Sequence, residues 1–409
     1  FYAENVRDFA FSTSQKFMWD AQAVEMNGKT VMAYSLYPKE GNPLWQEVST
    51  KAIVTTLKTY SRFTFDYPYP QATSVNAKWQ GMEYPMICWN HTRIGSNGKY
   101  SLRTKKDLIS VIIHEIGHNY FPMIVNSDER QWTWMDEGIN SFVQIYAMND
   151  FSKEYFPLSK HPKNIVPYMR GDQRFIAPIM SQGDYVFQFG SNAYRKPAAG
   201  LFILRETIMG RELFDYAFKT YVLRWKFKHP TPADFFRTME DASAVDLDWF
   251  WRGWFYTTQV NDLAVKEVEK YTVEPASDGR NIRLVNNGEI PRKKLKILTD
   301  YLDKTFWKER REKLQVPKYI YKITVEKKGE LLMPLIIELT LKNGQKIRKK
   351  FPAEIWRQNK KFVTKLFPTT SIVEEVAIDP DEQTADIDMN NNFYPKKETS
   401  RFEMFKKGK

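Results

Sequence analysis

The sequence contains very little cysteine and little histidine. Cys88 is the single cysteine among 409 residues, so a disulfide within the chain is excluded. One cysteine fits a cytosolic protein and equally a bacterial envelope enzyme that does not use disulfides. Because no histidine and asparagine are arranged to activate its thiol, we interpret Cys88 as a small packed residue and not as a nucleophile.

Long apolar runs are also absent. A membrane-spanning helix needs about 20 consecutive apolar residues, and segment 331–337 is among the longest apolar runs of this chain. We therefore expect no transmembrane segment. The sequence has no internal repeat, no signal peptide and no initiator methionine, so we expect a processed form of the protein. Its composition, 42% apolar and 15% aromatic, is sufficient for a large core.

The net charge of +12 is concentrated in the C-terminal part of the chain. Residues 259–409 contain 32 Lys and Arg against 23 Asp and Glu, whereas residues 1–258 contain 29 against 26. Basic clusters can attract an anionic surface, but no nucleic-acid-binding motif lies beside them. We interpret the excess as a solvated basic face and expect no nucleic-acid partner.

Two of the five histidines form the motif His114-Glu115-Ile116-Gly117-His118. On a helix, residues i and i+4 lie one above the other, so both imidazoles point the same way and suit two corners of a tetrahedral metal site. With so few histidines, this pattern arises by chance in roughly one chain in a few hundred. We therefore favour a catalytic metal over two unrelated surface or core histidines.

Glu137 follows the second histidine after eighteen residues and would supply a third ligand. Three protein ligands leave one position open for water and substrate, which distinguishes catalytic zinc from structural zinc. Glu115 lies near the same helix face but off the metal, where it can take a proton from the activated water.

The residues around the motif predict two helices joined by a loop. Thr104 and Asp107 resemble a capping box at the start of a strongly apolar helix, which Pro122 ends. A second helical pattern begins near Asp136, so that Glu137 falls in its first turn. Antiparallel packing of these helices would bring Glu137 beside the histidines.

Sequence patterns divide the chain into four parts. Residues 1–15 include a strand-like alternation, and residues 16–258 alternate strand and helix patterns and contain every catalytic candidate. Residues 259–394 are rich in strands and turns, with a polar insertion near 276–315, and 395–409 form a basic tail. Within the third part, Asn343-Gly344 between two alternating runs predicts a hairpin.

Two further candidates are weak when considered alone. In Gly81-Met82-Glu83-Tyr84-Pro85, a carboxylate near the metal could hold the free amino terminus of a peptide, but a simple turn beside a strand is the favoured explanation of the pentapeptide taken alone. The hydroxyl of Tyr194, with Tyr185 as the next candidate, could bind an oxyanion. An ordinary surface tyrosine is the alternative, because the chain has 22 tyrosines.

In combination, Gly-Met-Glu-Tyr-Pro, His-Glu-Ile-Gly-His, Trp134-Met-Asp-Glu-Gly138 and Tyr194-Arg-Lys resemble the M1 family of zinc aminopeptidases over about residues 1–258. The resemblance implies an α+β fold, with a thermolysin-like zinc metallopeptidase catalytic domain followed by a small β-sandwich domain. Residues 1–11 resemble the end of the family's N-terminal β-domain.

The resemblance also implies roles for particular residues and peptides as substrates. One Zn²⁺ per chain is expected on His114, His118 and Glu137, with Glu115 as general base. Glu83, with Gly81 and Met82 beside it, is expected to bind the substrate amine, and Tyr194 the oxyanion.

Three positions depart from the family pattern. Asp136 stands where many members have Asn, Pro197 where many have Gly, and Gln80 where a second Gly is common. We expect the large C-terminal helical domain, which covers the active site in relatives, to be missing. An open cleft would suit an endopeptidase, and a non-catalytic peptide-binding protein on this fold is a further alternative.

Overall fold

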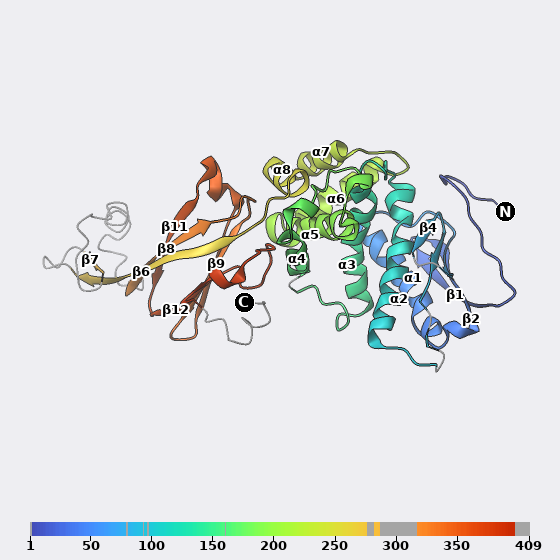
Figure 1. Cartoon of the computed structure of the whole chain (residues 1–409), viewed down its shortest axis with the longest axis horizontal. Coiled ribbons are helices and arrows are strands. Elements are labelled where there is room, and N and C mark those ends of the chain that lie inside the picture. The colour runs from blue at the N-terminus through green and yellow to red at the C-terminus, as the bar shows by residue number, and fades with distance from the viewer. Residues whose placement is uncertain are drawn as a thin grey trace. The chain divides into compact units, whose positions relative to one another are not determined.

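The computed structural model describes residues 2–78, 81–92, 94–95, 98–159, 161–275, 282–286 and 317–396. The chain divides into two compact units, Phe1–Thr258 and Gln259–Lys409 (Figure 1). Most of the polar insertion expected near 276–315 and nearly all of the expected basic tail lie outside the described residues. Together the units mix helices and strands, as an α+β chain does.

The first unit contains a five-stranded sheet in the order β1-β2-β3-β5-β4. Its strands are β1 (Phe17–Met26), β2 (Lys29–Pro38), β3 (Gln71–Asn76), β4 (Met82–Tyr84) and β5 (Ile87–Asn90). Strands β2, β3 and β5 run parallel, whereas β1 and β4 pair antiparallel at the two edges. The edge strand β4 carries Glu83, so this residue lies at a sheet margin and not in its centre.

Eight α-helices occur in the described part of the first unit, and three of them pack together around the His114–His118 motif. Helices α1 (Leu44–Phe63), α2 (Leu102–Gly117) and α3 (Ile139–Phe151) pack against one another (Figure 1). The others are α4 (Val166–Met169), α5 (Lys196–Ile203), α6 (Arg211–Trp225), α7 (Pro232–Ser243) and α8 (Asp248–Tyr256). Among the described residues, every helix is too short or too polar to cross a bilayer.

Two local expectations are wrong. The strand expected within residues 1–15 does not form, because the described residues before Phe17 pair with no other strand. Thr104 is not the cap of α2; the helix begins earlier, and the Ser101 side chain accepts from the Thr104 backbone N–H at 3.0 Å. Serine is the somewhat better N-cap residue of the two, so residue type slightly favoured the cap that the structure shows.

The second unit consists of two four-stranded sheets. One has the order β10 (Lys346–Phe351), β9 (Leu335–Leu341), β12 (Val373–Ile378) and β13 (Phe393–Tyr394). The other has the order β11 (Phe362–Thr369), β8 (Tyr319–Lys327), β6 (Leu263–Pro275) and β7 (Ile282–Val285). The antiparallel pairing of β9 with β10 confirms the hairpin predicted at Asn343-Gly344.

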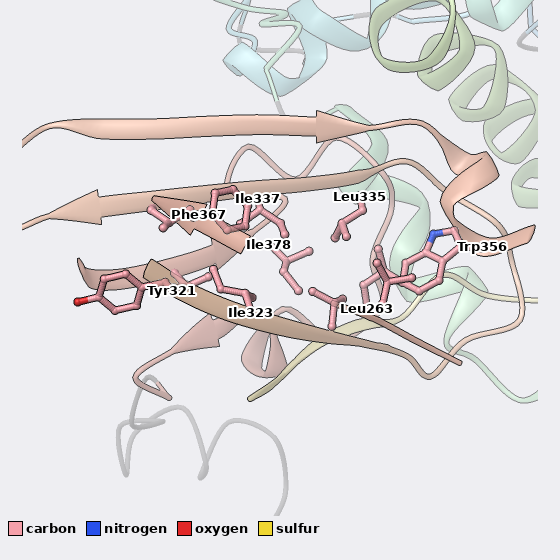
Figure 2. Packing of buried hydrophobic residues seen from close by; sticks show 12 residues of the cluster. Leu263, Tyr321, Ile323, Leu335, Ile337, Trp356, Phe367 and Ile378 are labelled. Atoms are coloured by element: carbon pink, nitrogen blue, oxygen red, sulfur yellow. The ribbon is translucent and has the colours of Figure 1, made fainter. Parts of the chain in front are cut away.

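Side chains from both sheets of the second unit form one apolar core. Ile323 from β8 and Ile337 and Ile378 from the opposite sheet are fully buried within it, and Trp356 closes one end (Figure 2). The Trp356 indole N–H donates to the Met333 carbonyl at 2.9 Å, so its polar atom is paired although the ring is buried. Burial of these inward faces is what stabilises the unit.

Truncating this core is expected to destabilise the second unit. Ile337→Ala should lower the free energy of unfolding by about 2–5 kcal/mol, because it removes buried methyl groups and leaves a cavity. Lys349, directly opposite Ile337 in the register, is exposed, so Lys349→Ala is the matched control and should change stability little. Urea denaturation measures both, and equal effects would contradict the assignment of Ile337 to the core.

Candidate metal centre and active site

Helix α2 presents the two histidines of the motif on one face. The centroids of the His114 and His118 rings are 4.6 Å apart and their planes are nearly perpendicular, at 88°. His118 is only 1% exposed. The apolar residues of α2 explain this depth, because Leu108, Ile109, Ile112, Ile113 and Ile116 are all buried and hold the helix in the core.

Glu137 meets both rings with one oxygen. Its Oε2 lies 3.0 Å from His114 Nε2 and 3.3 Å from His118 Nε2. A short π-helical segment, Trp134–Gly138, precedes α3 and brings the carboxylate to this point. In a tetrahedral zinc site with bonds of about 2.0–2.2 Å, neighbouring ligand atoms are about 3.3–3.5 Å apart, so these separations are close to those required.

The protonation of the two rings is set by their other nitrogens. His114 Nδ1 donates to the Gln144 side-chain carbonyl at 3.0 Å, and His118 Nδ1 donates to the Phe121 backbone carbonyl at 2.9 Å. Both acceptors lack a proton, so in the neutral rings Nε2 carries a lone pair. Two nitrogen lone pairs and a carboxylate oxygen then converge, and either a proton on Nε2 or a metal ion between them relieves the repulsion. The donor set therefore fits a metal ion.

Gln144 is a site residue that sequence reasoning missed. Its amide nitrogen donates to the Ser110 carbonyl at 2.9 Å, which fixes the side-chain oxygen toward His114. Gln144 lies seven residues after Glu137, which is two helical turns, so both face the same way. This spacing was the only sequence signal for Gln144. It becomes informative only when Glu137 is known to contact His114.

Glu115 lies in a nearly dry environment beside the histidines. Its side chain is buried, and its Oε2 has no hydrogen-bond partner among the described residues. Burial is the main cause that raises the pKa of Glu115 to about 8; the carboxylates of Glu83 and Glu137 act in the same direction, and His118 acts against them. Burial acts the same way on Glu137, but its contacts with the two histidines outweigh burial and bring the pKa of Glu137 below its ordinary value.

The segment before β4 packs directly on Glu115. Gly81 has a φ of +73°, and a Cβ built there would lie 2.9 Å from Glu115 Oε1. Both the backbone conformation and the space therefore favour glycine. Glu83 follows on β4 with its carboxylate beside that of Glu115. Met82 is 47% exposed, which agrees with the alternation of side chains along a strand.

Tyr194 lies in the site, and Tyr185 does not. The Tyr194 hydroxyl donates to Glu137 Oε1 at 2.6 Å, and its ring stacks on His114 with centroids 5.6 Å apart. Burial, and then the charge of Glu137, raise the pKa of Tyr194 above its usual value, so the hydroxyl keeps its proton. Tyr185 is 75% exposed. The structure therefore brings Tyr194 to the predicted metal ligands and leaves Tyr185 on the surface.

A cavity opens beside His114 and Tyr194. It has a volume of about 570 Å³, and Asp107, Ser110 and Gln144 are among its lining residues. A second cavity of about 290 Å³ shares Ser110, Gln144 and Tyr194 with it and continues toward apolar walls. Of the predicted ligands, His114 lines the larger cavity, whereas His118 is buried.

Comparison with known proteins agrees with this arrangement. The family model described as "Peptidase family M1 domain" matches residues 48–254, which is half of the chain. The chain belongs to peptidase family M1. The matched segment contains every residue placed above in the candidate site.

Individual M1 relatives are distant in sequence. The chain is 22% identical over 244 residues to aminopeptidase M1-A of Oryza sativa subsp. japonica, covering 57% of this chain and 27% of the relative. It is 23% identical over 233 residues to glutamyl aminopeptidase of Rattus norvegicus, covering 54% and 24%. The chain therefore spans about a quarter of the length of these curated relatives.

A solved M1 structure shares the fold. The crystal structure of Legionella pneumophila aminopeptidase A in complex with aspartic acid superposes with a TM-score of 0.64 at 13% identity. The match covers 90% of this chain and 38% of that one, so the likeness extends beyond the family segment into the second unit.

Helix α2 approaches helices α1 and α3 closely at Gly117. The Asn140 amide donates to the His114 carbonyl at 2.9 Å, and the Tyr60 hydroxyl donates to Asn140 Oδ1 at 2.7 Å. A Cβ on Gly117 would lie 2.3 Å from Asn140 Oδ1 and 2.4 Å from the Tyr60 hydroxyl. Helices α1, α2 and α3 therefore meet at this glycine.

Gly117→Ala should consequently destabilise the protein, although alanine is the better helix former. We expect a loss of about 1–3 kcal/mol from overpacking, with reduced metal affinity because the His114 carbonyl loses its partner. Gly190→Ala is the control, since a Cβ at that helical position meets nothing within 4 Å. Thermal unfolding of the metal-free variants measures the effect, and a stabilised Gly117→Ala would refute the close approach.

Proposed function

We propose that this protein is a zinc-dependent aminopeptidase that hydrolyses the N-terminal bond of peptides. The observation that carries the proposal is the convergence of three potential ligand atoms. Glu137 Oε2 lies 3.0 Å from His114 Nε2 and 3.3 Å from His118 Nε2. Two more carboxylates, Glu115 and Glu83, lie on the same side of the site. This arrangement supports a metal, a base and an amine-binding group in one cleft.

The proposal includes a finer domain assignment. Residues 16–258 would be a thermolysin-like catalytic domain and residues 259–394 a β-sandwich domain, with 1–15 as the end of an N-terminal β-domain and 395–409 as a tail. Support comes from the division between Thr258 and Gln259 and from the two sheets that share one core.

His114, His118 and Glu137 would hold one Zn²⁺, because two imidazoles and a carboxylate are ligands that zinc prefers. The bound ion would supply a Lewis acid for the substrate carbonyl and lower the pKa of water toward about 7. The chain's own contribution is to fix the two rings through Gln144 and Phe121 and to leave one side of the site open to the cavity.

Glu115 would act as the general base. Its carboxylate is 5% exposed and lacks a partner on Oε2, so little solvation stabilises its charge and it readily accepts a proton. It would take that proton from the attacking water and pass it to the leaving amine. Because Gly81 has no side chain, the backbone can pass beside Glu115 without displacing its carboxylate.

Tyr194 would bind the oxyanion that develops on the scissile carbonyl. Its hydroxyl is protonated and at present donates to Glu137 Oε1. During the reaction it would exchange this acceptor for the more basic oxyanion, so the stabilisation would appear mainly in the transition state. Stacking on His114 holds the ring while the hydroxyl changes partner.

Glu83 would bind the substrate ammonium. A charge-assisted hydrogen bond is stronger than a neutral one. Glu83 lies at the edge of the sheet, next to Glu115, so it would hold the substrate amino terminus close to the attacking water. Cleavage would then remove one residue. Substrates would be peptides, with the cavity beside His114 accommodating part of the chain.

Replacing the base should separate metal binding from turnover. Glu115→Gln should retain about one zinc per chain but lose at least about 10²-fold in kcat, because an amide cannot carry the proton. His118→Ala is the companion variant and should lose both metal and activity. Metal analysis and kinetics with an amino-acid amide measure the two effects; full zinc occupancy in His118→Ala would reject the ligand set.

Blocking the substrate amine should reveal the role of Glu83. N-acetylated peptides should be poor substrates of the wild type, because acetylation removes the cation and leaves a partly buried carboxylate unpaired. Glu83→Ala should narrow the gap between free and acetylated peptides. Mass spectrometry of one digested peptide provides the check: stepwise loss from the N-terminus is expected, and internal fragments appearing first would assign an endopeptidase instead.

A further inference from the structure

Asp136, the residue before the third predicted ligand, is a buried carboxylate on the far side of His118. It is 3% exposed, and its Oδ1 lies 2.9 Å from His118 Nδ1. The other nitrogen of the same ring, Nε2, faces Glu137 Oε2 at 3.3 Å. One imidazole therefore has a carboxylate oxygen at each of its two nitrogens.

The contact between Asp136 and His118 is electrostatic and not a directed hydrogen bond. Nδ1 has one proton, and that proton is directed at the Phe121 carbonyl, 2.9 Å away. Asp136 Oδ1 accepts no hydrogen bond from any of the residues that the structure describes. Asp136 Oδ1 thus lies against the ring edge without a hydrogen-bond donor of its own.

A negative charge on Asp136 is expensive to bury without compensation. Glu83 adds to the cost, since ligand atoms of Glu83, His118 and Asp136 all lie within 4.8 Å of one another. Arg7 is close enough for its charge to interact with Asp136, but its guanidinium pairs with Glu129 and its side chain is 35% exposed. A cation at the Nε2 side of His118 would compensate the charge directly.

The second histidine provides a comparison within the same site. His114 has the neutral amide of Gln144 at its Nδ1, whereas His118 has a carbonyl and, in addition, a carboxylate. A negative charge beside Nδ1–H increases the electron density that the ring donates through Nε2. The two histidines are therefore unequal ligands, and the difference comes from Asp136.

We propose that Asp136 is a positioning residue of the metal centre, which strengthens His118 as a ligand by balancing the positive charge that the ring acquires when a divalent cation binds. The inference rests on the proposed zinc site. Asp136 is buried and contacts Nδ1, the ring nitrogen on the opposite side from the one that would face the metal. Its effect is therefore on how tightly the ion is held.

The test compares zinc affinity with the stability of the metal-free protein. Asp136→Asn keeps the shape of the side chain and removes the charge. Competition with a chromophoric chelator should show zinc binding weakened by about 10–100-fold relative to wild type. The thermal midpoint of the metal-free variant should stay the same or rise, because a buried, poorly compensated charge is gone. Asp241→Asn, on the exposed face of α7, is the control and should change neither quantity.

Any other result would contradict the inference. Equal zinc affinity in wild type and Asp136→Asn would reject the role of Asp136 and leave the metal centre standing. Weaker binding together with a lower thermal midpoint of the metal-free variant, or its failure to fold, would make Asp136 a structural residue. Absence of zinc binding in the wild type would reject the metal centre itself, and the inference with it.

Discussion

The site depends on one geometric requirement: a single carboxylate oxygen must reach two imidazole nitrogens that come from a different helix. Helices α2 and α3 satisfy it because they approach closely at Gly117, where Asn140 binds the His114 carbonyl and Tyr60 binds Asn140. The π-helical segment at Trp134–Gly138 then turns Glu137 toward the rings. Every other feature of the centre, including the partners of both Nδ1 atoms, is built around this contact.

Charge is the second constraint. Glu83, Glu115, Asp136 and Glu137 share a largely buried space with two imidazoles. Burial pushes the pKa of Glu115 to about 8, whereas the histidines hold the pKa of Glu137 low. Neighbouring carboxylates whose environments move their pKa values in opposite directions are suited to different tasks. One suits proton transfer and the other suits permanent charge, which agrees with the proposed roles of base and ligand.

Prediction from the sequence succeeded where a short segment contains its own physical signal. The i, i+4 spacing places His114 and His118 on one face whatever surrounds them, and Asn343-Gly344 between alternating runs is enough for a hairpin. It failed where two local solutions were nearly equal, as with Ser101 and Thr104 at the start of α2. It also failed at residues 1–15, because a strand requires a partner and alternation alone does not provide one.

The sequence alone determined the candidate ligands, the candidate base and the family resemblance, because these depend on residue type and on spacing along one helix. Only the tertiary structure decided which side chains support them. Gln144, the Phe121 carbonyl and the Gly117 contact lie on separate segments, and whether they meet depends on how α1, α2 and α3 pack. Asp136 was visible as an unusual residue, but its position against His118 Nδ1 arises from the fold of the segment before α3. Packing between segments has no local sequence signature, so these partners could be found only in three dimensions.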